Sequence, residues 1–405
     1  MTDKTMPALR FRGFYDAWEQ RKFKDNIISI QTGTNLLGSE SNRGTPLLKM
    51  GNLQRGYFSF KKLEYLEENS LVELENIINY GDFLFNTRNT LELVGKGATW
   101  TGVNGQYAFN SNIARFKFDG IDTIFFNYLY NTQQMLSQVH ARAVGTTSVA
   151  AIYPRDLNSL LYYIPKLEEQ QKIGSFLKQL DNLITQNEHK LDLLKQLKQA
   201  YLQQIFSQEL RFAGFIDTWE QRKLGEFSDV RDGTHASPKY ISWGHPMVTS
   251  KNLTHSGLDM TDVAFLNDED FNEINKRSKV GIGDILFGMI GTIGNPVIVD
   301  RDDFAIKNVA LIKEKSSNSI INRWLLQYLK SPAFNRFIQK ENAGGTQKFI
   351  ALGLIRDMKL KVPELAEQQK IGSFFKQLDN LITLNQQKLN LLKKQKQAFL
   401  QKMFI

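Results

Sequence analysis

Two long stretches of the chain are nearly identical. Residues 169–206 read EQQKIGSFLKQLDNLITQNEHKLDLLKQLKQAYLQQIF, and residues 367–404 read EQQKIGSFFKQLDNLITLNQQKLNLLKKQKQAFLQKMF. They agree at 28 of 38 positions, at an offset of 198 residues. A second pair, LRFRGFYDAWEQRK from Leu9 and LRFAGFIDTWEQRK from Leu210, agrees at 11 of 14 positions. The sequence is therefore an internal duplication, and two copies of about 200 residues are too few and too long for a short-period solenoid.

Each of the two stretches has the pattern of one long amphipathic helix. Neither contains proline, and apolar residues recur every three or four positions along both. A single helix of this kind has little against which to bury its apolar stripe, so we expect the two to pack as an antiparallel coiled-coil pair. The residues expected to pack between the helices are Ile173, Phe176, Leu180, Leu183, Asn187, Leu191, Leu194, Ile371, Phe374, Leu378, Leu381, Asn385, Leu389 and Leu392.

Two of these residues, Asn187 and Asn385, are polar and occupy equivalent positions on or beside the stripe. A polar residue there can fix the register and direction of a helix pair at some cost in stability. The alternative is that each amide simply lies at the partly exposed edge of the seam.

The regions between the repeats are much less alike and match only in fragments, such as GDFLF from Gly81 and GDILF from Gly283. We interpret Gly-Asp in both fragments as a turn before a buried strand. Short β-rich runs alternate with helical stretches near residues 124–139 and 320–340, so the predicted fold class is α+β, with two α+β domains separated and joined by the long helices. The predicted segments are 1–168, 169–206, 207–366 and 367–405.

The chain also begins with the segment that otherwise follows the first long helix, and it ends where that segment would begin again. This layout predicts a closed, pseudo-twofold, ring-like arrangement with neighbouring termini. The alternative is a plain gene duplication without closure.

Composition excludes several classes of protein. The chain has 405 residues and no cysteine, which excludes disulfides, cysteine–zinc sites and thiol catalysis. Its first residues lack an apolar signal core, and polar residues interrupt every long apolar stretch, so we expect a cytoplasmic protein with no membrane contact.

The net charge of +9 is unevenly distributed. Residues 1–167 carry 18 basic and 15 acidic side chains, residues 207–365 carry 21 and 20, and residues 366–405 carry 7 and 2. More than half of the excess therefore lies on the last helix. Binding of nucleic acid by the domains must depend on local patches rather than on their overall charge.

The sequence contains no catalytic motif that we can identify. It has neither an Asn/Asp-Pro-Pro-aromatic loop nor a phosphate-binding G-x-x-x-x-G-K-[ST] loop. His235, His245 and His255 are ten residues apart, which matches no metal-ligand spacing. Asp300, Asp302 and Asp303 are interpreted as a solvated turn. We predict no catalytic residue and no metal site.

At this point the residues resemble a known family. The EQQKI, LDNLI and KQA segments of the helices, each following a proline, are similar to the spacer regions of specificity subunits from type I restriction-modification systems. The WEQRK prefaces, the GDFLF and GDILF strands and the duplicated layout are also similar to that family, so the resemblance covers essentially the whole chain. It implies a non-catalytic subunit whose two target recognition domains each read one half of a gapped, asymmetric DNA sequence.

The resemblance also implies partners and cofactors. The helices would set the gap between the half-sites on double-stranded DNA and dock two methyltransferase (modification) subunits. Restriction/translocase subunits would join through the complex, which serves phage defence. No cofactor is expected on this chain; S-adenosylmethionine, ATP and magnesium are implied for the partner subunits.

Candidate DNA-binding residues come from loops rich in Gly, Thr, Asn, Lys and Arg. Such loops suit phosphate contact through backbone N–H groups and base contact through side chains, although any one of them can be an ordinary solvated loop. The candidates are Thr34, Arg43, Lys49, Arg88, Asn89, Lys96, Thr146, Thr147, Thr234, His235, Lys239, Lys251, Asn252, Thr292, Gln347 and Lys348.

Two other functions fit parts of the sequence. A coiled-coil adaptor with two protein-binding domains would explain the helices equally well, but not why the domains diverge while the helices stay nearly identical. An enzyme with a hidden site in one domain is disfavoured by the absence of motifs. Salt-dependent, sequence-selective duplex binding separates the DNA reader from the adaptor, and activity of the isolated chain on DNA would support the enzyme.

Overall fold

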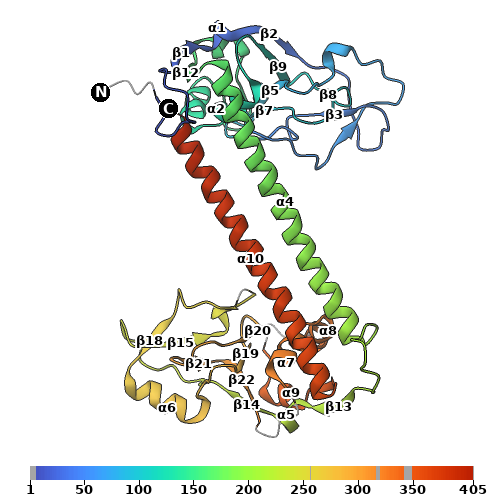
Figure 1. Cartoon of the computed structure of the whole chain (residues 1–405), viewed down its shortest axis with the longest axis vertical. Helices are drawn as coiled ribbons and strands as arrows, with labels where there is room; N and C mark the ends of the chain where they lie inside the picture. Colours follow the sequence, from blue (N-terminus) through green and yellow to red (C-terminus); the bar gives the residue numbers. More distant parts are fainter. Residues whose placement is uncertain (1–5, 256, 316–319, 342–348, 405) are drawn as a thin grey trace. The chain divides into compact units, whose positions relative to one another are not determined.

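A computed structural model describes residues 6–255, 257–315, 320–341 and 349–404 (Figure 1). The chain forms two compact units. Unit 1 comprises Met1–Glu188 and Lys388–Ile405, and unit 2 comprises His189–Gln387. Each unit therefore contains one globular domain and one half of each long helix. The chain passes between the units within these helices.

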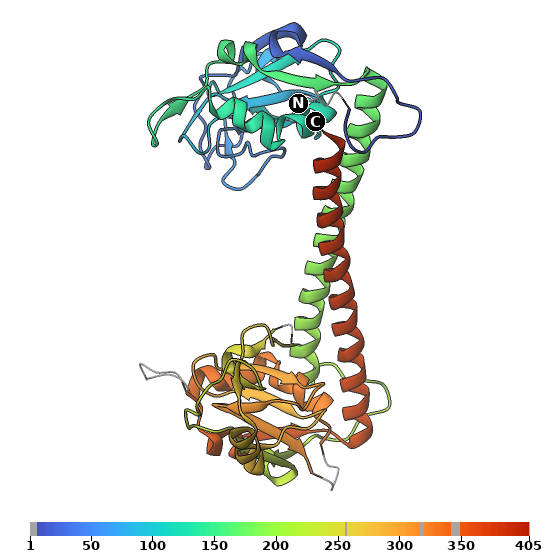
Figure 2. The same cartoon turned by 90° about the vertical axis from the view of Figure 1, so that its left-hand side faces the viewer.

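The two repeated stretches form α4 (Leu167–Phe206) and α10 (Leu365–Met403), each beginning two residues before the predicted start. Within each unit the two helices run side by side in opposite directions (Figures 1 and 2). In unit 1 the ring of Phe176 packs edge-on against Phe399, with centroids 5.0 Å apart. In unit 2 Tyr201 packs against Phe374 in the same way, at 5.2 Å. The predicted antiparallel pair is confirmed.

The buried stripe of the helix pair differs in part from the predicted one. Ile173, Leu180 and Leu191 are buried as expected, but Leu183 and Leu381 are 47% and 49% exposed. The seam follows a spacing of alternately four and three residues. It therefore passes through Leu177 and Ile184 on α4 and Phe375 on α10, and Ile184 is one position from the exposed Leu183.

The domain of unit 1 has a core between α2 and α3 and a four-stranded antiparallel sheet of order β2-β9-β5-β7. Three smaller sheets have the orders β4-β3-β8, β10-β11-β6 and β1-β12. The elements are β1 (Glu19–Lys22), α1 (Phe23–Asn26), β2 (Ile27–Thr32), β3 (Pro46–Leu48), β4 (Glu64–Tyr65), η1 (Leu74–Asn76), β5 (Phe83–Asn86), β6 (Arg88–Asn89), β7 (Gly97–Thr99), β8 (Ala108–Phe109), β9 (Ile113–Phe118), α2 (Thr123–Tyr130), α3 (Gln133–His140), β10 (Val144–Gly145), β11 (Ala150–Ala151), η2 (Pro154–Ser159) and β12 (Leu161–Ile164).

The domain of unit 2 repeats the four-stranded sheet and two of the smaller sheets. Its four-stranded sheet has the order β14-β22-β19-β20, and smaller sheets have the orders β18-β15-β21, β13-β23 and β16-β17. The elements are β13 (Glu220–Lys223), α5 (Leu224–Phe227), β14 (Ser228–Asp232), β15 (His245–Thr249), η3 (Ser250–Asn252), β16 (Leu253–Thr254), β17 (Gly257–Leu258), β18 (Ala264–Leu266), α6 (Asp268–Ser278), β19 (Ile285–Gly288), β20 (Gly294–Ile298), β21 (Ala305–Lys307), β22 (Val309–Glu314), α7 (Asn322–Leu329), α8 (Pro332–Glu341), α9 (Leu352–Asp357) and β23 (Lys359–Val362).

The two domains share a fold although their sequences differ widely. In both, a parallel strand pair (β3 with β8, β15 with β21) lies in the second sheet. The Gly-Asp fragments are turns before fully buried strands, with positive φ at Gly81 and Gly283. The carboxylates of Asp82 and Asp284 each accept a backbone N–H three residues earlier. The α+β prediction is confirmed.

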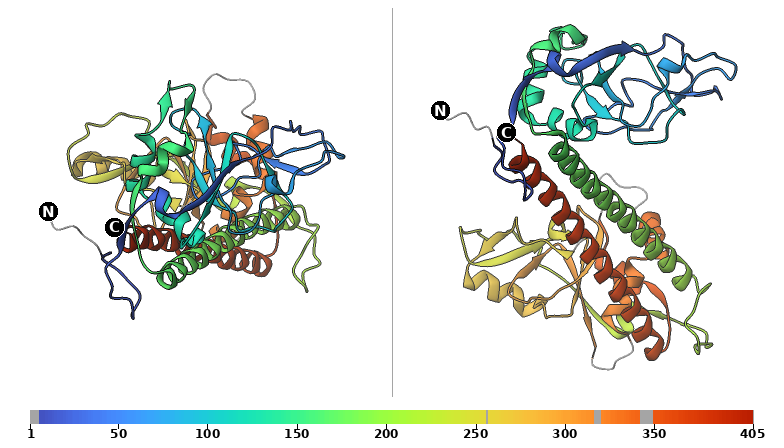
Figure 3. Two further views of the ribbon diagram at one scale, coloured as in Figure 1. Left: turned by 90° about the horizontal axis from the view of Figure 1, so that it is seen from above. Right: turned by 45° about the horizontal axis from the view of Figure 1, so that its top comes forward.

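The preface of each domain lies against the end of a long helix. In unit 2 the N–H of Leu210 donates to the carbonyl of Gln204 at 3.0 Å, close along the chain. In unit 1 the N–H of Leu9 donates to the carbonyl of Lys402 at 2.9 Å, so the same contact joins opposite ends of the chain. The two ends of the described chain therefore meet in unit 1, as the duplicated layout predicts (Figure 3). Among the described residues, no helix is long and apolar enough to cross a membrane.

Candidate nucleic-acid interface

A buried ion pair fixes each preface to the start of a long helix. The guanidinium of Arg10 donates to both oxygens of Glu169, at 2.8 and 2.6 Å. Arg211 donates to both oxygens of Glu367, at 3.0 and 2.7 Å. Hydrogen bonding to these carboxylates raises the pKa of each arginine. Two-point contacts of this kind are geometrically specific, so each domain is held on its helix in a defined orientation.

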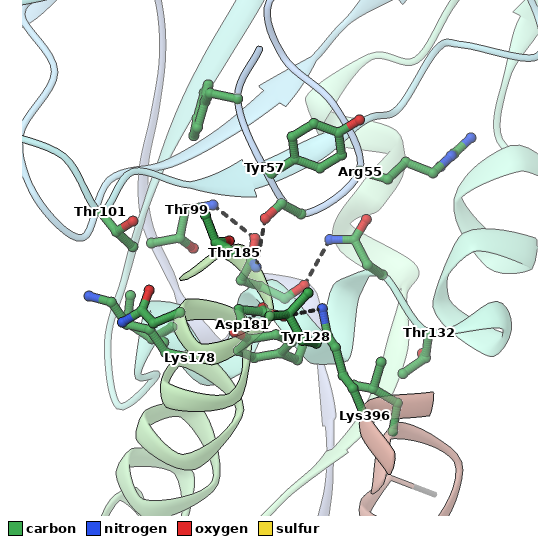
Figure 4. Close-up of a pocket in the computed structure, with 18 of the residues that line it drawn as sticks. Arg55, Tyr57, Thr99, Thr101, Tyr128, Thr132, Lys178, Asp181, Thr185 and Lys396 are labelled. Atoms are coloured by element: carbon green, nitrogen blue, oxygen red, sulfur yellow. Dashed lines mark hydrogen bonds and ion pairs between the residues drawn. The ribbon is translucent and has the colours of Figure 1, made fainter. Parts of the chain in front are cut away.

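A second set of contacts joins each domain to both long helices. In unit 1 the hydroxyl of Tyr128, on α2, donates to Asp181 of α4 at 2.7 Å, and Lys396 of α10 lies 2.5 Å from the other oxygen of Asp181. Figure 4 shows both side chains pointing toward this carboxylate. Burial raises the pKa of Tyr128 well above its ordinary value, which keeps the hydroxyl protonated as a donor.

Two loops, one in each domain, have the same length and the same glycines at their ends, but their other side chains differ. We call residues 33–44 the first reading loop and residues 233–244 the second. Each begins with Gly-Thr and ends with Gly. A Cβ at Gly33 would lie 2.0 Å from the carbonyl oxygen of Phe109, and one at Gly233 would lie 2.4 Å from that of Ile306. No other residue fits at these positions without a shift of the backbone.

The glycines that end the two loops are enclosed by backbone in the same way. A Cβ at Gly44 would lie 2.6 Å from the carbonyl oxygen of Leu66, and one at Gly244 would lie 2.2 Å from that of Leu266. Between these fixed ends, most residues of both loops are exposed. The two domains therefore present different side chains on the same backbone support.

In the second reading loop the ring of His235 is held at both nitrogens. Nδ1 lies 2.8 Å from Oδ1 of Asn308, and Nε2 lies 3.0 Å from Asp232, whose other oxygen accepts from Arg277. Asp232 is buried, whereas His235 is exposed. His235 is thus a positioned side chain at the surface of the loop.

The structure brings together four predicted residues of the first domain. Strand β6, which carries Arg88 and Asn89, pairs with β11, and β11 pairs with β10. Thr146 and Thr147 lie in the exposed turn between β10 and β11. This hairpin projects from the edge of the domain in Figure 2. Gln347 and Lys348, the corresponding predictions in the second domain, lie outside the described residues.

Several predicted residues have structural tasks instead. Thr34 is buried, and its hydroxyl accepts the N–H of Leu36 at 3.1 Å. The side-chain amide of the buried Asn252 accepts the N–H of Thr249 and donates to the carbonyls of Asp259 and Asp262. Thr234 accepts the N–H of Ala236 at 3.1 Å. Because burial or turn bonding occupies these side chains, we withdraw Thr34 and Asn252 as base readers.

The predicted lysines fall into two groups. Lys49 and Lys251 are paired with Glu64 and Asp262, at 2.7 and 2.8 Å. Lys96 is buried and donates to Gln54 at 2.8 Å, and burial lowers its pKa. The remaining predicted residues, Arg43, Lys239 and Thr292, are all exposed.

Sequence reasoning did not find a large groove in unit 1, with a volume of about 1180 Å³. Its walls come from α4, α10, α2 and the loops around Tyr57 and Thr101 (Figure 4). Lys178 and Lys396 line it together with the aromatic rings of Phe60 and Trp100. Because these segments lie far apart in the sequence, no local pattern reveals the groove.

Comparisons with known proteins agree with the resemblance found in the sequence. The chain matches the family described as type I restriction modification DNA specificity domain over residues 15–196 and 216–394. It is 25% identical, over 95% of its length and 92% of the relative's, to a putative type I restriction enzyme specificity subunit, MjaX, of Methanocaldococcus jannaschii. It is 22% identical to the EcoKI specificity subunit of Escherichia coli, over 82% of this chain and 75% of that one.

Solved structures show the same fold. The crystal structure of a type I restriction-modification S subunit from M. genitalium superposes with a TM-score of 0.65 and 16% identity, covering 99% of both chains. A chain from a study of complex assembly in the type I system superposes with a TM-score of 0.52 and 17% identity, covering 96% of this chain and 98% of that one. Because the family match covers most of both halves of the chain, the chain belongs to the specificity subunits of type I restriction-modification systems, with two target recognition domains that recognise DNA.

Proposed function

We propose that this subunit recognises a bipartite, gapped and asymmetric DNA target, with one half-site read by each domain. The observation that carries the proposal is the pair of reading loops. They have equal length and the same pinned glycines, but nearly all the residues between Gly-Thr and the closing Gly differ. Two loops with the same backbone support but different side chains favour two half-sites with different bases.

We further propose that α4 and α10 set the length of the gap. Each is a continuous helix that links the two domains. Helices without interior proline are stiff, and their length grows by 1.5 Å per residue. Two readers joined in this way fit half-sites at a fixed separation, as dimeric readers do.

We propose that the long helices also dock two methyltransferase subunits through their exposed leucines. In unit 2 these are Leu193 and Leu197 on α4 and Leu381 and Leu384 on α10. They occupy positions on one flank of the buried seam, and an antiparallel pair brings these flanks of both helices to one face. Unit 1 carries the equivalent Leu183 and Leu391. Two such surfaces, related by the repeat, favour two partner molecules.

We also propose which subunits carry the chemistry and where in the cell the complex works. The subunit recognises DNA without catalysing a reaction, and it binds no cofactor of its own. S-adenosylmethionine, ATP and magnesium serve the methyltransferase and restriction/translocase subunits that assemble with it. The complex works in the cytoplasm, where it meets both the chromosome and invading phage DNA.

The test is to assemble the chain with its methyltransferase subunit and titrate the complex with duplex DNA at several salt concentrations. The proposal predicts that affinity falls steeply with salt and that one sequence is preferred over others. A complex that binds all duplexes equally, or none, would favour the protein adaptor instead.

A further inference from the structure

One large apolar side chain on the second reading loop is left mostly uncovered by the residues that the structure describes. Trp243 is 81% exposed, and Tyr240 and Ile241 beside it are also exposed. A tryptophan carries 150–250 Å² of surface, of which most is apolar. Such a residue in contact with water marks a surface that another molecule covers.

The backbone on both sides of Trp243 is fixed. The N–H of Ile241 donates to the carbonyl of Phe265 at 3.0 Å, and Gly244 packs against the carbonyl of Leu266. The indole is therefore presented from a supported backbone, so little backbone entropy is lost when it binds.

The composition of the loop indicates what covers the indole. Residues 233–244 contain no acidic side chain, and they include His235 and Lys239. Beneath the loop, Lys307 donates to Ser237 at 3.0 Å. A flat aromatic ring among basic and neutral polar groups suits stacked bases carried on a phosphate backbone.

The first reading loop has an equivalent feature. Leu37 is 88% exposed, and Leu36 next to it is exposed as well. Arg43 supplies an exposed cation in the same loop. Leucine and aromatic side chains placed in this way insert between base pairs in several DNA-binding proteins, where they unstack a flexible step.

We propose that Trp243 and Leu37 are specificity-determining wedges, each of which inserts at a base-pair step of its own half-site. The inference rests on the proposed DNA-reading function. It goes further by assigning the apolar contact and one residue per half-site. Hydrogen-bonding neighbours such as Lys239 and Arg43, which are exposed, then contact the edges of the bases that the wedge displaces.

The experiment uses the complex of the full chain with its methyltransferase subunit. The methylated sequence of the wild-type complex is mapped first, and three duplexes are made: the intact target and two in which one half-site is scrambled. Competition binding gives a preference ratio for each half-site. The variants are Trp243→Ala, Trp243→Phe and Leu37→Ala, with Ile216→Ala as control, since Ile216 is 90% exposed but lies outside both loops.

We expect Trp243→Ala to lower the preference ratio of one half-site by on the order of tenfold and to leave the other unchanged. Leu37→Ala should act on the opposite half-site, Trp243→Phe should restore most of the ratio, and Ile216→Ala should change neither. Unchanged ratios in both loop variants, or equal losses at both half-sites, would overturn the inference. If the wild-type complex shows no sequence preference at all, the proposed function itself fails.

Discussion

Lys198 of α4 lies 2.6 Å from Asp379 of α10, and the repeat places Lys396 of α10 2.5 Å from Asp181 of α4. Each helix thus supplies one lysine and one aspartate to two equivalent ion pairs. Along two antiparallel helices, the numbers of facing residues keep a constant sum. The two numbers of each ion pair add to the same value, so both pairs belong to one antiparallel register. By contrast, Asn187 and Asn385 each donate to a carbonyl of their own helix, four residues earlier. The ion pairs therefore carry the information on register, which is one of the two roles considered for the asparagines.

Asp379→Asn should destabilise unit 2. The substitution leaves Lys198, which is largely buried, without its anion, and it replaces one of the two oxygens that accept from Lys198 and Gln327 with an NH2 donor. Loss of one member of such a pair costs on the order of 3 kcal/mol when the other stays buried, and less where water reaches it. Denaturant unfolding of the full chain measures the change. Asp192→Asn, at an exposed position of α4, is the control; equal midpoints for the two variants would contradict the assignment.

Lys330→Asn should stabilise the protein near neutral pH. Burial, followed by repulsion from Lys198, lowers the pKa of Lys330 in the folded state. Between this lowered pKa and the unfolded value, the unfolded chain binds more protons, so stability of the wild type rises with pH through that range. The equivalent C-cap in unit 1 is Asn131, which shows that the position accepts asparagine.

The measurement for Lys330→Asn is the melting temperature across a pH series. The gain over the wild type should be largest at neutral pH and should shrink as the pH rises and the wild-type lysine loses its proton. A gain that stays constant with pH, or a loss at neutral pH, would show that the burial of this charge is not the cause.

Leu193→Glu combined with Leu381→Glu should weaken docking of the methyltransferase subunit without unfolding the chain. Both side chains are about half exposed, so the fold tolerates a charge there. An interface formed by these leucines would bury the new carboxylates, which costs several kcal/mol. Calorimetric titration with the partner measures the effect, and Gln199→Glu, on another face of α4, is the control. Equal affinity in the variant and control would place the docking surface elsewhere.

Arg88→Ala should weaken binding of the target duplex. Arg88 lies on the exposed hairpin sheet with Asn89, Thr146 and Thr147. If its guanidinium contacts a base, the loss is about 1–3 kcal/mol and one base position becomes less specific. A phosphate contact would instead weaken the binding of all duplexes alike. It would also reduce the slope of log affinity against log salt concentration by about one. Arg222→Ala, at the base of the second domain, is the control; no change in either quantity removes Arg88 from the interface.

The sequence predicts the repeated parts of this protein well because their information is local. Apolar spacing indicates the long helices, and a Gly-Asp pair before an apolar run indicates each turn and strand. The exposure of Leu183 was missed because Leu183 and Ile184 are adjacent, and one position decides which of them faces the seam. A count of apolar residues every three or four positions cannot make that choice without the partner helix.

The DNA-facing residues were harder to predict because residue type does not indicate exposure. Asn252 and Thr34 have the chemistry of base readers, but the fold uses them in turns. Trp243 is not among the candidates, which were chosen for polar chemistry, although its position beside a glycine in a loop without apolar periodicity is a usable signal. The Lys198–Asp379 pair joins residues 181 positions apart, and only the register of the helices brings them together.

The most direct test of the account is to map the bases methylated by the complex, with the wild-type chain and with a chain carrying one extra heptad at the middle of both α4 and α10. Seven residues keep the apolar seam in phase and add about 10.5 Å, or about three base-pair steps. We predict two unlike half-sites that are the same in both chains, with the gap lengthened by about three base pairs in the second. An assembled, folded complex that methylates the same gapped sequence with and without the insertion would contradict the account.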